Sequence, residues 1–265
     1  MKFIASTAFT KTDHAAALDT LAGLGFREID LLSINDWGLV SPALLVADFD
    51  AAVDRVRSVL EPRGLKAVSL NTAFTPQLFE REDEAENERR REQVRAVCRF
   101  MVEMGIKIGA HYPGYIADWK NDPEGVFAST VETLREVQAI AREHGVTLAP
   151  EIHAKTPFEA PDNARRLINT EIPGIPYTYE PSHFIISGLD GKATDDLLDG
   201  ATHCHFRTCA EGQIQAAPPD GFDALDWMMD RLRARNYDGY ISIEYLPGAE
   251  FSVENAIRTL LERYG

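Results

Sequence analysis

The sequence is poor in cysteine and contains no long hydrophobic run. Its three cysteines, Cys98, Cys204 and Cys209, form no Cys-x-x-Cys pair, which argues against a disulfide framework or a zinc ribbon. No stretch approaches the roughly 18 apolar residues of a membrane span. The apolar N-terminal residues 1–9 are too few for the core of a secretion signal and suit a strand better. These absences predict a soluble cytoplasmic protein.

Positive charge is scarce as well. The 265 residues include 27 Lys and Arg against 42 Asp and Glu, so the formal net charge is −15. The densest basic run, residues 89–91, lies within a stretch rich in glutamate, residues 84–92, and this mixture is typical of a salt-bridged helix face. Nucleic-acid binding requires a basic surface that neutralises phosphates. We therefore expect neither a nucleic-acid nor a membrane partner.

The chain also lacks a Gly-x-Gly-x-x-Gly motif or a phosphate-binding loop after its first predicted strand, which argues against a nucleotide-binding open sheet. Instead, short apolar strands alternate with amphipathic helices, a pattern that predicts a parallel sheet. Eight repeats in 265 residues favour an α/β fold with one closed (β/α)8 barrel, a TIM barrel, spanning residues 1–265 as a single domain. A doubly wound sheet is the alternative. The predicted strands are residues 2–6, 26–32, 65–70, 106–111, 146–152, 176–180, 201–207 and 239–245, and the predicted helices are residues 13–24, 49–60, 83–104, 126–144, 163–169, 194–198, 222–236 and 252–264.

Histidines and carboxylates gather at the ends of the later predicted strands. In a barrel of this type the C-terminal ends of the strands converge on one face, where active sites lie. Three carboxylates around one mouth repel one another, and a divalent cation would remove that cost. Period-two alternation places His203, His205 and Arg207 on one face of their strand. The full set at the strand ends is His111, Glu151, His153, Glu180, His183, His203, His205, Arg207 and Glu244.

Four segments resemble the motifs of one family, the xylose isomerase-like barrels, which include sugar isomerases and epimerases. They are Ala-Pro-Glu-Ile-His at 149–153, Glu-Pro-Ser-His-Phe at 180–184, His-Cys-His-Phe-Arg at 203–207 and Asp-Gly-Tyr-Ile-Ser-Ile-Glu-Tyr at 238–245. The motifs occur in the family's order, each on the predicted strand, and the resemblance extends over essentially the whole chain. It implies a TIM barrel and, in the ketose 3-epimerase branch, metal-dependent proton transfer on a sugar.

The resemblance also implies roles for individual residues. The metal ligands would be Glu151, Glu180, His205 and Glu244, with Glu151 and Glu244 also serving as the catalytic acid–base pair. His183 and Arg207 would contact substrate oxygens. This oxygen-rich ligand set suits one Mn²⁺, Mg²⁺ or Co²⁺ ion, with Zn²⁺ as an alternative. The family usually has Asp where this chain has Glu180, and the added methylene shifts that carboxylate by about 1.5 Å.

These parts predict proton transfer through an enediolate. The metal would polarise a carbonyl and an adjacent hydroxyl, one glutamate would remove the proton from the carbon beside them, and the opposite glutamate would return a proton to the other face. The expected partner is a small carbohydrate, a ketose or a related keto sugar or keto acid. Further candidates for substrate contact are His111, at the end of strand four, and the loop aromatics Trp37 and Tyr112. The resemblance also suggests a homodimer or homotetramer.

Three other functions stay open. A substrate with a leaving group β to the carbonyl would make the enzyme a lyase or dehydratase that uses the same enolate. An apurinic endonuclease shares the fold but needs further histidines, where this chain has Asn71 and the histidine-free segment 208–220. A non-catalytic binding barrel is the last alternative, and the complete set of carboxylates argues against it. Asp30 and Asn71 are lesser candidates for the site, and Gln213 or Gln215 is expected to influence specificity.

Overall fold

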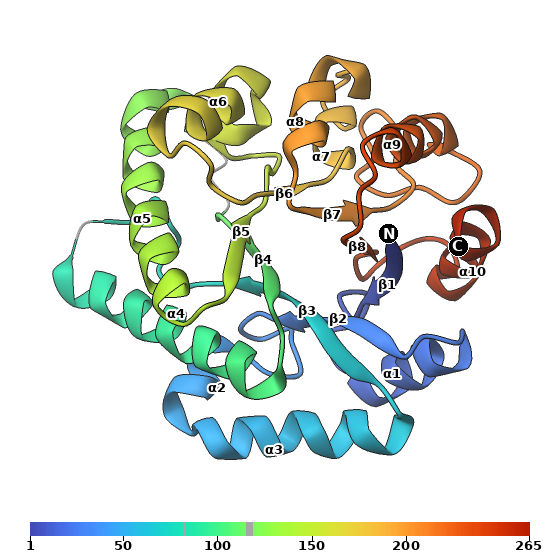
Figure 1. The fold of residues 1–265 in the computed structure, drawn as a ribbon, viewed down its shortest axis with the longest axis horizontal. Coiled ribbons are helices and arrows are strands. Elements are labelled where there is room, and N and C mark those ends of the chain that lie inside the picture. Colours follow the sequence, from blue (N-terminus) through green and yellow to red (C-terminus); the bar gives the residue numbers. More distant parts are fainter. Residues whose placement is uncertain (82, 115–118) are drawn as a thin grey trace.

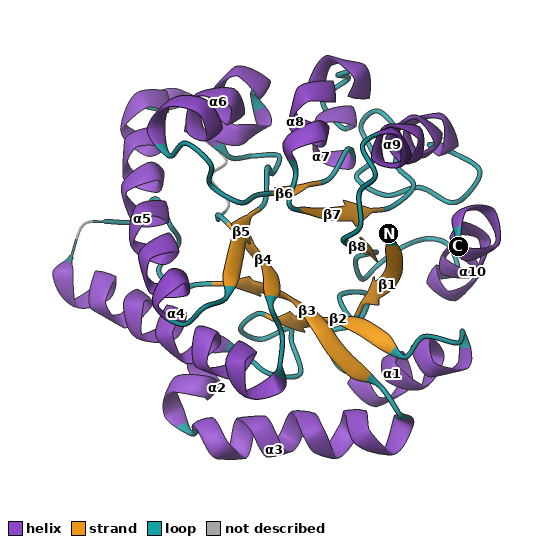
Figure 2. Ribbon diagram, viewed as in Figure 1, coloured by secondary structure: helices purple, strands orange, loops and turns teal. Residues whose placement is uncertain are grey.

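The protein is a parallel barrel surrounded by helices. A computed structural model describes residues 1–81, 83–114 and 119–265, and eight of their segments form one sheet in the order β5-β4-β3-β2-β1-β8-β7-β6. Figures 1 and 2 show these strands at the centre with the helices arranged around them. The strands are β1 (Lys2–Ser6), β2 (Glu28–Ser33), β3 (Lys66–Ala73), β4 (Ile108–Tyr112), β5 (Thr147–Pro150), β6 (Thr178–Tyr179), β7 (His203–Phe206) and β8 (Tyr240–Ile243).

The sheet is nearly closed at the seam between β5 and β6. A single parallel bridge joins Glu151 to Thr178, and the backbone N–H of Ile152 donates to the carbonyl of Thr178 at 3.0 Å. Each pairing between neighbouring strands is parallel, as the alternation of strands and helices requires. The predicted (β/α)8 barrel is thus confirmed, and the strand ends point toward one mouth.

Several of the helices begin at a residue whose side chain caps them. Asp13, Asp48 and Asp122 each accept a hydrogen bond from a backbone N–H of the first turn that follows. Gly105, in the left-handed conformation, ends the charged helix Glu84–Met104. The helices are α1 (His14–Gly23), α2 (Pro42–Ala47), α3 (Phe49–Leu60), α4 (Glu84–Met104), α5 (Pro123–Glu143), α6 (Pro161–Arg166), α7 (Ser182–Ile185), α8 (Asp195–Gly200), α9 (Phe222–Ala234) and α10 (Val253–Tyr264).

Two short helices, α2 and α7, are absent from the sequence-based expectation. Each contains six residues or fewer, too short for a 3.6-residue period to become visible in the sequence. Ser41 caps α2 and Pro42 occupies its first turn, which is the signal that could have revealed it. Helix α7 follows Pro181 directly and has no side-chain cap, so little in the sequence marks its start.

The predicted strands near the site were too long at their C-terminal ends. Strands five to eight were expected to reach residues 152, 180, 207 and 245, but the strands end at residues 150, 179, 206 and 243. The first residues of the loops that follow these strands are also buried. The apolar sequence pattern therefore continues beyond the last residue of each strand. Glu151, Glu180, Arg207 and Glu244 are therefore each the first residue after a strand, which places their side chains at the barrel mouth.

Helix α4 differs from the predicted solvated face in one respect. Arg91 and Arg95 pair with Glu88 at 2.7 and 2.8 Å on its surface, as expected. Arg90, in contrast, is only 1% exposed, and its guanidinium donates to the carbonyls of Gln77 and Glu80 at 3.0 and 2.9 Å. This arginine anchors the loop between β3 and α4. Among the described residues, no helix combines the length and hydrophobicity needed to cross a membrane.

Candidate metal centre and active site

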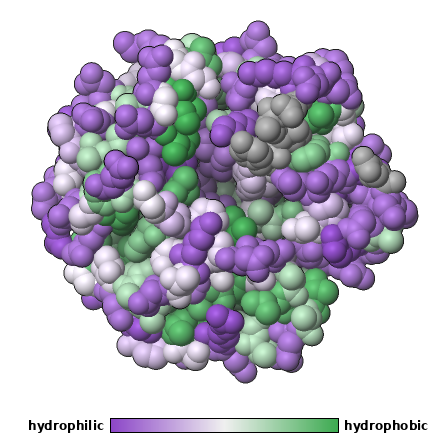
Figure 3. Space-filling view, turned by 180° about the vertical axis from the view of Figure 1, so that it is seen from behind, coloured by the Kyte–Doolittle hydropathy of each residue, from purple (hydrophilic) through white to green (hydrophobic). Residues whose placement is uncertain are grey.

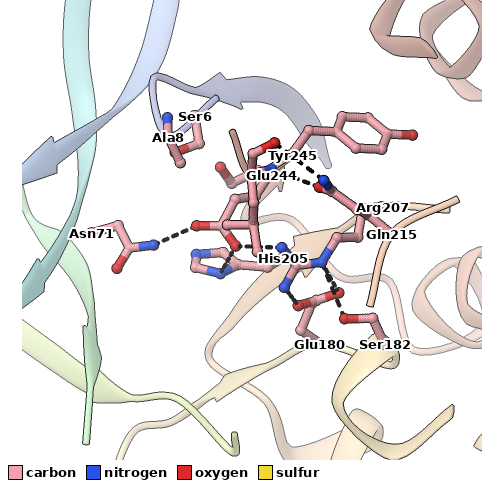
Figure 4. A network of polar contacts seen from close by, with 12 residues as sticks. Ser6, Ala8, Asn71, Glu180, Ser182, His205, Arg207, Gln215, Glu244 and Tyr245 are labelled. Carbon is pink, nitrogen blue, oxygen red and sulfur yellow. Dashed lines mark hydrogen bonds and ion pairs between the residues drawn. The ribbon is translucent and has the colours of Figure 1, made fainter. Parts of the chain in front are cut away.

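Five charged or titratable side chains meet at the mouth of the barrel. Glu151, Glu180, Arg207 and Glu244 follow β5, β6, β7 and β8 directly, and His205 lies within β7. All five are almost completely buried, with exposed fractions of 4% or less. Figure 4 shows His205, Arg207 and Glu244 grouped together, with Glu180 beside Arg207. Parallel strands that end at one level bring together residues far apart in sequence.

Three of these residues offer ligand atoms to a common point. His205 Nδ1 lies 2.9 Å from Glu151 Oε1 and 3.6 Å from Glu244 Oε2. The ligand atoms of Glu151, His205 and Glu244 all lie within 4.8 Å of one another. Two buried carboxylates and an imidazole of this spacing suit a divalent cation, because such an ion offsets their mutual repulsion and their loss of hydration. The donor set therefore fits a metal.

Glu180 faces Arg207 rather than this three-residue group. The Nε of Arg207 donates to Glu180 Oε1 at 3.0 Å, and its Nη2 forms a second short contact with Glu180 Oε2. A bidentate pair of this kind is strong and geometrically specific. Arg207 also places Nη1 3.3 Å from Glu244 Oε2 and donates to Ser182 Oγ at 3.1 Å. Glu180, which stands where the family usually has Asp, thus directs its carboxylate to the guanidinium of Arg207.

Buried charges shift the pKa values of the titratable groups at the site. Burial alone would lower the pKa of His205, but the carboxylates of Glu244 and Glu151 outweigh it and raise the pKa to about 10. Burial is likewise overcome at His183, where Glu180 and Glu151 raise the pKa to about 9. In Glu180, Arg207 and His183 outweigh burial and lower the pKa to about 2. The carboxylates therefore favour positive charge at this point of the barrel, and a divalent cation would supply it.

A second group of potential ligands shares Glu151. The ligand atoms of Glu151, His153 and His183 also lie within 4.8 Å of one another. The rings of His153 and His183 stack with their centroids 3.7 Å apart, and His153 Nδ1 lies 2.6 Å from the carbonyl oxygen of Ala154. His183 Nε2 is also 3.1 Å from Glu180 Oε2. The imidazole of His183 therefore lies between the two carboxylates that follow β5 and β6.

A cavity of about 340 Å³ opens above these groups. Its lining includes Glu151, Glu244, His183, Arg207 and both predicted loop aromatics, Trp37 and Tyr112. Seen from the side opposite to Figure 1, the molecular surface is hollowed near the middle, and hydrophilic and hydrophobic residues both border the hollow (Figure 3). Most predicted contact residues thus lie around one space large enough for a small organic molecule.

His111 and Glu180 lie apart from the residues that line this cavity. The imidazole of His111 is fully buried, its two nitrogens have no hydrogen-bond partner among the described residues, and burial lowers its pKa to about 3. Phe74 packs against the ring at a centroid distance of 5.9 Å. The side chain of His111 therefore sits in the barrel wall as a neutral group.

Two residues given little weight from the sequence contact the central group. Asn71, at the end of β3, donates from Nδ2 to Glu244 Oε1 at 2.6 Å (Figure 4). Asp30 on β2 is fully buried, accepts a hydrogen bond from Ser242 at 2.9 Å, and has Oδ2 3.9 Å from His205 Nε2. Burial raises the pKa of Asp30. Polar residues at the ends of β2 and β3 were the only sequence signal for these two.

Several lining residues went unnoticed in the sequence. Ile186, Ile214 and Leu246 border the cavity from the loops that follow α7, β7 and β8. Gln215, expected to influence specificity, instead binds the backbone of Leu246, accepting from its N–H at 2.7 Å and donating to its carbonyl at 3.2 Å. Isolated aliphatic residues in loops carry no periodic signal, so only the folded arrangement reveals them.

Comparison with known proteins places the chain in a family. The family model described as "Xylose isomerase-like TIM barrel" matches residues 18–263. The chain belongs to this family. Membership in the xylose isomerase-like barrels confirms the resemblance predicted from the four strand-end motifs. No curated protein matches the chain significantly.

Solved structures share the fold of this chain at low sequence identity. A D-tagatose 3-epimerase-like protein is 16% identical with a TM-score of 0.75, and the match covers 100% of this chain and 97% of that one. The IolI protein with a bound zinc atom is 18% identical with a TM-score of 0.74, covering 100% and 99%. The probable 3-DHS dehydratase AsbF of Bacillus anthracis is 13% identical with a TM-score of 0.73, covering 99% and 98%.

Proposed function

We propose that this protein is a divalent-metal-dependent isomerase or epimerase of a ketose or a related keto sugar or keto acid. The observation that carries the proposal is the convergence of Glu151, His205 and Glu244 within 4.8 Å at the base of a cavity of about 340 Å³. Similarity to a D-tagatose 3-epimerase-like protein agrees with this class of reaction. A small carbohydrate fits the cavity, and the net charge of −15 argues against a nucleic acid.

Glu151, His205 and Glu244 would hold one ion, Mn²⁺, Mg²⁺, Co²⁺ or Zn²⁺, and Glu180 stays the proposed fourth ligand. When bound, the ion supplies the Lewis acidity that weakens the C–H bond beside a carbonyl. Glu180 takes part in this set only by giving up contacts with Arg207, so we expect its contribution to be the weakest. The similar IolI structure contains a zinc atom, which agrees with metal binding by a barrel of this fold.

The remaining chemistry belongs to the chain's own side chains. In the proposed reaction, one of the carboxylates Glu151 and Glu244 accepts the proton from the carbon beside the carbonyl, and the electron pair of the C–H bond enters an enediolate. The opposite carboxylate returns a proton, either to the other face of the same carbon or to the neighbouring one. Arg207 Nη1 lies 3.3 Å from Glu244 Oε2 and makes no hydrogen bond among the described residues. Arg207 and His183 both line the cavity and are placed to donate to the developing oxyanion.

A dehydratase or lyase is the second candidate. It uses the same first step, after which the enolate expels a hydroxide or other leaving group β to the carbonyl. Similarity to a probable 3-DHS dehydratase favours this alternative. The two reactions differ in whether the carbon skeleton retains all of its oxygen atoms.

The test begins with the metal. Elemental analysis of the purified protein should find about one divalent ion per chain, and incubation with a panel of ketoses in D₂O should place deuterium on a carbon next to the carbonyl. Products of unchanged mass apart from deuterium would identify an isomerase or epimerase, and loss of water would identify a dehydratase. A protein that binds none of the four ions would refute the proposal.

A further inference from the structure

The cavity above Glu151 and Glu244 has two chemically different sides. One side consists of aliphatic and aromatic groups, and the other carries Tyr112, His153 and Lys155 above the carboxylates. The apolar side is made by Leu32, Ile34, Trp37, Ile186, Ile214 and Leu246, which we call the apolar arc. This division follows the order of the strands and is not a scatter of single residues.

The members of the apolar arc come from neighbouring parts of the barrel. They lie on β2 and the loop after it, after α7, and in the loops after β7 and β8. In the sheet these positions follow one another as β2-β1-β8-β7-β6, whereas Tyr112 ends β4 and His153 and Lys155 follow β5. Tyr112, His153 and Lys155 therefore lie on the part of the mouth that faces the apolar arc. The polar lining residues His183 and Arg207 follow β6 and β7, but they are paired with the carboxylates of Glu180 and Glu244.

Hydrogen bonds hold the apolar arc in place. The indole N–H of Trp37 lies 3.0 Å from the carbonyl of Ala8 and 2.9 Å from that of Thr10, so its polar atom is already occupied by the backbone. The amide of Gln215 binds both backbone groups of Leu246 and so ties the loop after β7 to the loop after β8. Trp37 and Leu246 are thus held by contacts outside the cavity and present only apolar surface to a ligand.

Such a wall discriminates against hydroxyl groups. A hydroxyl that leaves water and faces aliphatic carbon loses its hydrogen bonds and gains none. The carbonyl and hydroxyl groups that react at Glu151 and Glu244 have polar partners below them, and further hydroxyls can meet Tyr112, His153 and Lys155. A sugar with hydroxyls on all sides would direct some of them at the apolar arc, which offers them no donor or acceptor.

We propose that the substrate is a keto sugar that carries an apolar alkyl or aryl substituent, which packs against the apolar arc while its carbonyl end lies over Glu151 and Glu244. This inference rests on the proposed function for the identity of the reacting end. The apolar arc, and not the reacting groups, determines which substituent binds. The contribution of the substituent to binding can therefore be measured separately from the reaction.

The experiment compares matched probes on the metal-loaded protein. Unsubstituted ketopentoses and their 5-O-benzyl ethers are incubated in D₂O, and kcat/KM for deuterium exchange is measured for each pair. Burial of the added ring should raise kcat/KM at least about tenfold, or about 1.4 kcal/mol. The preference should fall in Ile214→Thr and in Ile186→Thr, and should persist in Leu44→Thr, a control on α2 that is 43% exposed.

A second measurement separates this inference from the proposed function. Calorimetry with 5-O-benzyl pentitols, which have no carbonyl and cannot react, tests the apolar arc alone. Tighter binding of the benzylated than of the plain pentitols, with no exchange on any ketose, would support the apolar substituent and overturn the isomerase proposal. Exchange that is as fast on the plain ketoses as on their benzyl ethers would overturn the inference and leave the isomerase proposal standing. Absence of both binding and exchange would overturn the inference as well.

Discussion

The first five strands and the last three build their halves of the barrel differently. In the first half, β3 has 8 residues and α3, α4 and α5 have 12, 21 and 21. In the second half, β6, β7 and β8 have 2, 4 and 4 residues, and α6, α7 and α8 have 6, 4 and 6, although α9 and α10 have 13 and 12. The second half supplies Glu180, His205, Arg207 and Glu244, so most of the charged site lies where the strands are shortest.

This difference shows how the scaffold supports the site. Long helices bury continuous apolar faces and contribute most of the hydrophobic stabilisation, as with Val53, Val56 and Leu60 on α3. Buried charges cost free energy unless they are paired, so they are tolerated where the rest of the barrel compensates. We therefore expect substitutions in the second half to affect chemistry first, and those in the first half to affect stability first.

The largest expected effect is on chemistry in the second half. Glu244→Gln retains the shape of the side chain but removes the negative charge and the proton acceptor, so metal binding should weaken and deuterium exchange should fall by at least about 10³-fold. Elemental analysis and exchange in D₂O measure both. Glu250→Gln, an exposed glutamate after β8, is the control and should behave as the wild type. Full exchange by Glu244→Gln would show that this carboxylate has no catalytic part.

The next largest effect is on stability in the first half. Arg90→Met on α4 leaves the carbonyls of Gln77 and Glu80 without their buried donor, which should lower the free energy of unfolding by about 3 kcal/mol. Chemical denaturation measures the change. Arg89→Met is a matched control one residue away, because Arg89 is 52% exposed and its removal should cost less than about 1 kcal/mol. Equal costs for the two variants would contradict the anchoring role of Arg90.

The same contrast explains how far the sequence predicts the fold. Strand β1 and helix α3 have the predicted bounds, because each shows its own periodicity and α3 starts after a capping aspartate. In the second half, the predicted strand at 176–180 shrinks to β6, and α7 was not predicted. A strand of two residues and a helix of four contain only about one period each, so no repeat exists for the sequence pattern to detect.

The sequence predicted that residues at the strand ends come together, but not how they pair. Strand-end position placed Glu151, His205 and Glu244 in a larger set of candidates, since parallel strands end on one face, and the family resemblance implied them, with Glu180, as ligands. The pairing of Glu180 with Arg207 depends on one methylene of side-chain length, which only the folded geometry resolves. The apolar arc depends on loops whose conformations come from particular hydrogen bonds, such as those of Gln215.

The two halves also differ in how the pKa values of their buried histidines are shifted. His205 in the second half is surrounded by carboxylates that raise its pKa to about 10, whereas burial lowers the pKa of His111 in the first half to about 3. Below pH 6.5 the unfolded chain protonates His111 but the folded chain does not, so acidification destabilises the fold. Between pH 7.5 and pH 5, this residue should cost about 2 kcal/mol of unfolding free energy.

Replacing His111 tests this cost. His111→Gln should lose about 2 kcal/mol less than the wild type over the same pH interval, whatever its stability at pH 7.5. Denaturant unfolding of both proteins at the two pH values gives the double difference. An unchanged pH dependence would mean that His111 becomes protonated in the folded protein and does not remain a neutral part of the wall.

The smallest expected effect concerns a hydrogen bond between the two halves of the barrel. Asn71 reaches from β3 to Glu244, and its hydrogen bond at 2.6 Å holds that carboxylate toward His205. Groups that orient a metal ligand in this way commonly change affinity about 10-fold to 100-fold, so Asn71→Ala should weaken metal binding about tenfold. Competition with a chelator at fixed pH measures the dissociation constant, and Asn255→Ala, exposed on α10, is the control. An unchanged affinity in Asn71→Ala would mean that the second half orients Glu244 without help from the first, through Arg207, whose Nη1 lies 3.3 Å from the same carboxylate.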